Sequence, residues 1–171
     1  QVRFGPLTTG GVINYLSTPI PEHSSGEVRF LYGTDNQMRG QAWYGDRQKT
    51  PAGNFGYLAE VFAHRVDGFK TIDSTPDFQD GDDTGFTIFE PMLKLCWEPP
   101  SGKYQSLEFK IGYSDIENKE TYLGLNDADF DRDPFRRYSA TRFDELNSEN
   151  TRMYLRHLIE VSSALEWTTT A

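Results

Sequence analysis

The sequence predicts an all-β protein whose strands follow one another as an antiparallel, up-and-down meander. Aromatic residues make up 14% of the 171 residues, and aromatic side chains are enriched in strands. The 15 glycines and 9 prolines favour many short segments that end in turns over long helices. Several stretches alternate apolar and polar residues, which is the period-two pattern of a strand with two unlike faces.

The N-terminal segment has turn and strand signals of its own. Gly10 and Gly11 stand immediately before a β-like run from Val12 to Leu16. Paired glycines permit positive φ or a close backbone approach, so we expect a turn that feeds a short strand. Pro19 and Pro21 end this strand, because proline cannot donate to a ladder. A linker then leads to Gly26.

Beyond Gly26 the alternation predicts six amphipathic strands and the start of a seventh. They span about 26–32, 38–44, 54–65, 86–97, 107–114 and 151–161, and the seventh begins within 164–171. The pattern is clearest in the fifth strand, where Leu107 and Phe109 alternate with Glu108 and Lys110. One face of the predicted sheet is therefore apolar and the other polar.

The predicted connections are unequal in length. A tight turn follows Gly33, short links lie at 47–53 and 99–103, and long links lie at 67–85 and 115–150. Short turns on one side and long loops on the other are typical of an outer-membrane barrel. Alternation alone leaves a soluble β-sandwich open, because charged strand residues suit either a solvated face or a polar lumen. Trp97 and Trp167, near strand ends beside short turns, favour the barrel.

Composition excludes several classes of function. A formal net charge of -9 argues against a nucleic-acid partner, because phosphate contacts need clustered Lys and Arg. No stretch approaches the roughly 18 apolar residues of a membrane-spanning helix. Cys96 is the single cysteine, so it forms no internal disulfide. The three histidines are scattered along the chain, and we therefore predict neither an enzyme nor a cofactor.

Several motifs of the chain resemble those of one transport family. The run Thr9 to Asn14, Thr-Gly-Gly-Val-Ile-Asn, resembles the end of the plug domain of TonB-dependent receptors, and 16–19 stand where the chain leaves the plug. Residues 26–34 and 65–69 look like the first barrel strands of that family. The stretch Glu120 to Leu125, Glu-Thr-Tyr-Leu-Gly-Leu, is similar to an early extracellular loop of the ferric-citrate branch.

The resemblance implies a fragment of a larger receptor. Residues 1–22 would be the C-terminal end of the plug domain and its linker, and residues 23–171 the N-terminal part of a 22-stranded transmembrane β-barrel. The receptor would lie in the outer membrane of a Gram-negative bacterium, in contact with lipid. It would take up an iron chelate, ferric citrate or another siderophore, driven by TonB through segments outside this chain. The main alternative is a soluble β-sandwich binding module.

Two groups in the second long loop are candidate sites. The acidic run from Asp127 to Asp133 invites a calcium site, but Arg132 stands where an EF-hand needs glycine and Tyr138 where it needs glutamate. We therefore expect a solvated acidic loop. An iron-citrate complex is anionic, and arginine suits carboxylates best, so the ligand-binding candidates are Arg136, Arg137 and Arg142. Ordinary salt bridges within the loop are the alternative for these arginines.

Overall fold

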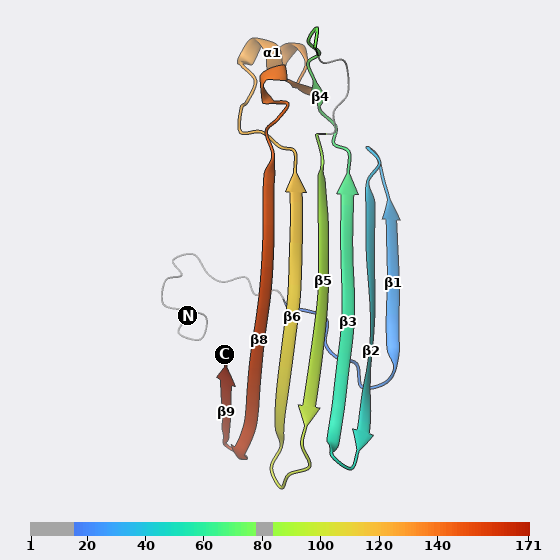
Figure 1. Cartoon of the computed structure of the whole chain (residues 1–171), viewed down its shortest axis with the longest axis vertical. Helices are drawn as coiled ribbons and strands as arrows, with labels where there is room; N and C mark the ends of the chain where they lie inside the picture. The colour runs from blue at the N-terminus through green and yellow to red at the C-terminus, as the bar shows by residue number, and fades with distance from the viewer. Residues whose placement is uncertain (1–15, 78–83) are drawn as a thin grey trace.

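The computed structural model describes residues 16–77 and 84–171, and most of them form one seven-stranded antiparallel sheet (Figure 1). The sheet order is β1-β2-β3-β5-β6-β8-β9. These strands are Ser25–Tyr32, Met38–Thr50, Gly53–Val66, Phe86–Glu98, Gln105–Asn118, Leu146–Ser162 and Leu165–Thr170. The predicted all-β, up-and-down meander is confirmed. The strand predicted around 12–16 falls largely outside the described residues, and Leu16 itself is not in a strand.

The first hairpin turn depends on two residues that tolerate a left-handed backbone. Asp35 and Asn36 have φ of 53° and 55°, the conformation that Asp and Asn adopt more readily than other non-glycine residues. The turn closes with hydrogen bonds from the Gly33 amide to the Gln37 carbonyl, 2.9 Å, and from the Gln37 amide to the Thr34 carbonyl, 3.0 Å. The strands β1 and β2 therefore reverse tightly at this point.

Three strands extend well beyond the alternating pattern that predicted them. β2 runs to Thr50, so the link expected at 47–53 is only 51–52, and the other two strands are β6 and β8. β6 continues to Asn118 and β8 begins at Leu146, so the connection is 119–145 and not the expected 115–150. The ladder between these strands holds register from Ser114 opposite Asn150 to Asn118 opposite Leu146. Backbone hydrogen bonds make this pairing, and they do not require one apolar face. Apolar alternation therefore does not predict the ends of β6 and β8.

The described parts of the two long connections, 67–77 with 84–85 and 119–145, lie at the same end of the sheet, and the short turns after β2, β5 and β8 lie at the other (Figure 1). The described parts of these loops meet through a parallel two-stranded sheet of β4 (Thr71–Ile72) and β7 (Arg136–Arg137). The second loop also holds α1 (Asp127–Arg132) and a 3₁₀ helix, Ser139–Thr141. We call these elements the outer-loop body.

Very little of the described chain is buried as a hydrophobic core. Leu58, with no exposed surface, and Ile72, 3% exposed, are the only hydrophobic residues buried in the described ranges. Leu58 lies in the middle of β3, whereas Ile72 lies in the outer-loop body. The large sheet is therefore not organised around an apolar interior of its own. Its two faces differ in the side chains that they present, and a candidate functional site is sought there.

Candidate functional site

One face of the sheet, the apolar face, exposes large hydrophobic side chains. In β1 and β8 the exposure is greatest: Val28 is 80%, Phe30 71% and Met153 72% exposed. The strand registers align such residues into rows across the sheet. One row consists of Tyr44, Ala59, Leu93, Ile111 and Met153. A contiguous apolar surface of this extent marks a contact with a partner or with lipid.

The apolar face has a limited height along the strands. On β6 it runs from Leu107 to Tyr113, and Asp115 and Glu117 follow on the same side. At about 3.4 Å per residue the apolar stretch is about 20 Å long. Glu149 of β8 lies opposite Asp115, so the polar boundary continues across the strand pair. The face is therefore a band, comparable to the roughly 25 Å apolar band of transmembrane barrels.

Aromatic side chains gather where this band meets the short turns. Phe55 and Trp97 stack with ring centroids 6.1 Å apart and an interplanar angle of 14°. The Trp97 Nε1 donates a 2.9 Å hydrogen bond to the Ala52 carbonyl in the turn after β2. Trp167, on the last strand, is 61% exposed. Such rings, apolar on one side and hydrogen-bonded on the other, suit a membrane–water interface.

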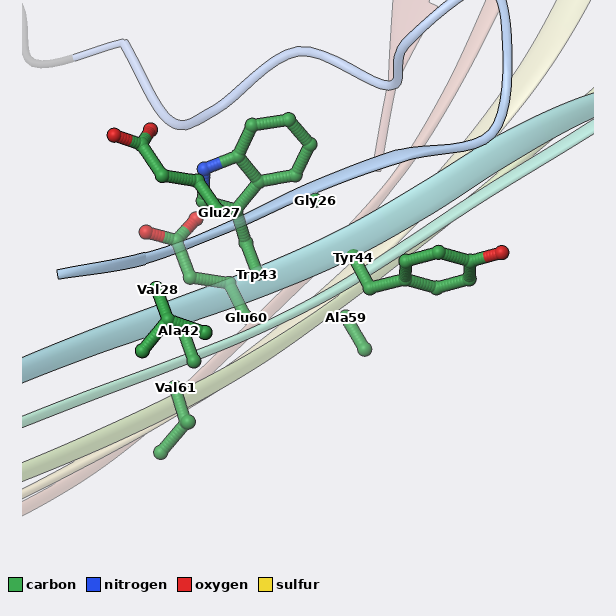
Figure 2. Close-up of a pocket in the computed structure, with 9 residues that line it drawn as sticks. All are labelled: Gly26, Glu27, Val28, Ala42, Trp43, Tyr44, Ala59, Glu60 and Val61. Carbon is green, nitrogen blue, oxygen red and sulfur yellow. The ribbon is translucent and has the colours of Figure 1, made fainter.

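A shallow groove of about 500 Å³ is hollowed into the apolar face across β1, β2 and β3. Figure 2 shows Val28, Ala42, Ala59 and Val61 on one side of the strands, whereas Glu27, Trp43 and Glu60 project from the opposite side. In β2 and β3 the small side chains of Ala42 and Ala59 form its floor and leave this space open. Its lining is the apolar face itself, so it contains no cluster of polar side chains that could perform chemistry.

The opposite face, the polar face, carries charged side chains that bond with one another. Glu108 accepts hydrogen bonds from the Tyr154 hydroxyl at 2.5 Å and from Arg156 at 3.1 Å. Equivalent pairs join Gln41 to Glu60, 2.5 Å, and Ser114 to Glu90, 2.8 Å. Next to these residues lies a recess of about 340 Å³. The charges of Glu60, Glu90 and Glu108 therefore lie away from the apolar face, and hydrogen bonds within the sheet satisfy them.

Residues 16–22, which we call the strap, cross the polar face. The Lys94 Nζ donates to the Thr18 carbonyl at 2.5 Å and to the Ser17 carbonyl at 3.3 Å. The Lys110 Nζ donates to the Ser17 hydroxyl at 3.0 Å. Sequence reasoning missed this role, because a lysine on a polar strand face carries no signal that it binds another segment.

In the outer-loop body, Arg136 joins the two long loops. Its Nε lies 2.8 and 3.0 Å from the Asp73 carboxylate oxygens, and its Nη1 donates to Asp129 at 2.6 Å. Its guanidinium carbon also lies 5.1 Å from the Tyr138 ring centroid. The hydrogen bond from the Tyr138 hydroxyl, followed by the charge of Arg136, lowers the pKa of Asp129 below its usual value. Asp129, in the same loop as Arg136, therefore stays ionised and holds the Arg136 guanidinium, which in turn binds Asp73 of the other loop.

Arg137 points into the outer-loop body and is only 4% exposed. Its Nε donates to the Thr141 hydroxyl at 2.8 Å, and its Nη atoms donate to the carbonyls of Lys119, Thr141 and Asp144. Arg142 lies with its guanidinium carbon 4.6 Å from the Phe143 ring centroid. The contacts of Arg136 and Arg137 are thus internal, as in the salt-bridge alternative. Ligand binding by Arg136, Arg137 and Arg142 stays a prediction.

The acidic run of the second long loop forms α1 and its flanks. Asn126 caps the helix, and its side chain accepts a 2.9 Å hydrogen bond from the Asp129 amide. The Asp129 carboxylate accepts from Asn126, Arg136 and Tyr138. Within 16–77 and 84–171 there is no group of three or more His, Cys, Asp or Glu side chains that could hold a metal ion. In the same ranges, no helix has the length and apolarity needed to cross a membrane.

The described residues thus define a class by their fold: an all-β, antiparallel meander of seven strands, with one apolar face exposed and one polar face hydrogen-bonded. No family model matches the chain, and neither a curated protein nor a solved structure is found to be similar to it.

Proposed function

We propose that the chain is part of a TonB-dependent outer-membrane receptor that imports an iron chelate. In this proposal the seven-stranded sheet is a sector of the wall of a 22-stranded barrel, with its apolar face against lipid and its polar face toward the lumen. Residues 1–22 would be the plug end and linker. The observation that carries the proposal is the exposed apolar band on a sheet whose opposite face holds the charges.

The exposure of the two faces is inverted relative to that of a sheet in water. Burial of apolar surface drives folding in water, so a soluble sheet covers its apolar face and solvates its charged one. Here Lys94, on the polar face, is 5% exposed, whereas its neighbour Leu93, on the apolar face, is 37% exposed. In a barrel wall the lipid takes the place of the missing interior, and charges remain on the lumen side.

A soluble β-sandwich needs a second sheet over the apolar face. Apart from the seven-stranded sheet, residues 16–77 and 84–171 form one two-stranded sheet, β4 with β7, which lies in the outer-loop body. That body sits beyond one end of the strands and not over their face (Figure 1). The described chain thus offers no covering layer of its own, which favours lipid over a sandwich.

The proposed contact of the apolar face with lipid can be tested with two tryptophans that lie on opposite faces of the sheet. Trp97 belongs to the apolar face, whereas Trp43 projects from the polar face (Figure 2). We expect brominated acyl chains in vesicles to quench the fluorescence of Trp97 strongly and that of Trp43 weakly, because only Trp97 meets lipid. The measurement uses two single-tryptophan variants of the refolded chain, W43F/W167F and W97F/W167F.

The two variants control for each other, since they share the lipid, the refolding procedure and the Trp167→Phe change. Equal quenching of both tryptophans, or stronger quenching of Trp43, would contradict the assignment of the apolar face to lipid. Quenching of neither would indicate that the chain does not enter the bilayer.

The proposed import of an iron chelate rests on the resemblance of residues 120–125 to the ferric-citrate branch and on the arginines that follow in the same loop. The test uses Arg142, because Arg136 bridges the two long loops and Arg137 is buried in contacts within the second loop. In the receptor proposed to contain this chain, we expect Arg142→Gln to weaken ferric-citrate binding about tenfold, the worth of one charge-assisted hydrogen bond. Equilibrium binding measures it.

Lys103 supplies the matched control, since it lies in the short turn after β5, at the far end of the sheet from the outer-loop body. Lys103→Gln should leave ferric-citrate affinity unchanged. An unchanged affinity of the Arg142 variant would remove Arg142 from the binding site, while leaving the membrane assignment to the fluorescence result.

A further inference from the structure

The strap follows one row of the sheet. The registers place Gly45, Leu58, Lys94 and Lys110 side by side across β2, β3, β5 and β6. Ser17 is bonded to both lysines, Thr18 to Lys94, and Pro21 lies over Gly45. The strap therefore crosses four strands roughly at right angles, along a single line of side chains.

Two glycines make room for the far half of the strap. A Cβ atom on Gly45 would lie 2.7 Å from Pro21 Cδ, and one on Gly56 would lie 3.0 Å from Ile20 Cγ2. Cys96 borders the same depression, because its Cβ lies 3.7 Å from the Gly56 Cβ position. A side chain at Gly45 would clash with Pro21 and with the Tyr57 carbonyl, and one at Gly56 would displace Ile20, so glycine at both positions lets Ile20 and Pro21 pack closely on the polar face.

No backbone ladder holds the strap. Among the described residues, no backbone–backbone hydrogen bond is made by residues 16–22, and Pro19 and Pro21 have no amide hydrogen to donate. What holds it is two lysine side chains, the packing of Ile20 and Pro21, and a loose 3.9 Å ion pair between Glu22 and Arg47. The strap can thus leave while every strand pair of the sheet stays intact.

The docked strap also carries a cost. Lys94 is 5% exposed beneath it, and this buried ammonium gives up hydration that its hydrogen bonds and the nearby Glu108 and Glu60 carboxylates must replace. Lifting the strap would return Lys94 to water. The free-energy difference between the docked and the lifted strap is therefore smaller than the number of contacts alone suggests. A small difference of this kind lets a segment populate two states.

We propose that the strap is a latch, whose residues Ser17–Pro21 dock in the Gly45–Gly56 depression and lift from it as one unit when the Lys94 contacts break. The latch ties the chain that precedes Ser17 to the sheet reversibly. It is independent of the membrane assignment, because all its contacts lie on the polar face.

Cys96 is a built-in reporter of the latch, since it borders the depression and is the single cysteine of the chain. In the refolded full chain in detergent, we expect Lys94→Met to speed the reaction of Cys96 with a small water-soluble thiol reagent about tenfold. Loss of a nearby cation disfavours the reactive thiolate, so charge alone would slow the reaction. Lys103→Met, in a turn away from the strap, should react at the wild-type rate.

Gly56→Ala tests the same latch without touching a charge. Its new methyl group meets the Ile20 side chain and not the backbone, so the sheet stays folded while the packing of Ile20 in the docked strap is weakened. We expect faster labelling than in the wild type, and a smaller effect of Gly56→Ala when Ile20 is already alanine. A wild-type rate in Gly56→Ala, or in a folded Lys94→Met chain, would overturn the latch.

Discussion

Replacing Leu93 by arginine is expected to destabilise the chain in lipid vesicles by about 2–4 kcal/mol, the cost of an arginine on the lipid side near the bilayer midplane. Leu93 occupies the central row of the apolar face, between Ala59 of β3 and Ile111 of β6. In the proposed barrel wall its side chain meets only acyl chains, which offer no partner for a guanidinium. Urea unfolding of the vesicle-bound chain measures the change.

The neighbouring residue supplies the control. Met92 precedes Leu93 on β5 but faces the other way, into the recess of about 340 Å³ and opposite Glu60. Met92→Arg should therefore change the free energy of unfolding by less than about 1 kcal/mol, as expected for a partly solvated ion pair. If both arginines cost the same, or if the Met92 variant costs more, the assignment of the two faces is wrong.

Replacing Arg137 by alanine is expected to open the outer-loop body. The guanidinium bonds to the Thr141 hydroxyl and to the carbonyls of Lys119, Thr141 and Asp144. Removing it leaves several inward-facing acceptors without a donor, each costing about 1–3 kcal/mol. We therefore expect about 3 kcal/mol less protection of the β7 amides in hydrogen exchange, with the amides of β5 and β6 unchanged.

Arg132 is the matched control for this change, because it lies in the same loop, in the last turn of α1, and is exposed. Arg132→Ala should alter β7 protection by no more than a few tenths of a kcal/mol. Protection of β7 that survives Arg137→Ala would mean that contacts between the loops, such as the ion pairs Arg136–Asp73 and Lys70–Glu120, hold the body together without the Arg137 guanidinium.

Sequence alternation predicted the sheet well where side chains differ between the faces. The strand at Leu107 to Ser114 was evident because four apolar residues alternate with polar ones. Its continuation to Asn118 was not, since Asp115 and Glu117 are polar on the face that is apolar before them. β4 and β7 could not be predicted at all, because each is two residues long and joins loops far apart in sequence.

The candidate site was predictable in part. The two faces follow from alternation, because successive strand residues point to opposite sides. The partners of the loop arginines do not follow from it. Asp73 lies 63 residues before Arg136, and no local pattern relates them. Likewise nothing around Lys94 indicates that Ser17 and Thr18, more than 70 residues earlier, accept its hydrogen bonds.

The amino-acid order by itself determined the central parts of the seven strands of the large sheet and the polarity of each face, because these depend on neighbours one or two residues apart. Only the tertiary structure decided which face stays exposed, that Arg137 is buried, and that the strap lies along the Gly45 to Lys110 row. Those features depend on contacts between distant segments, and such contacts form only once register and loop closure have brought the segments together.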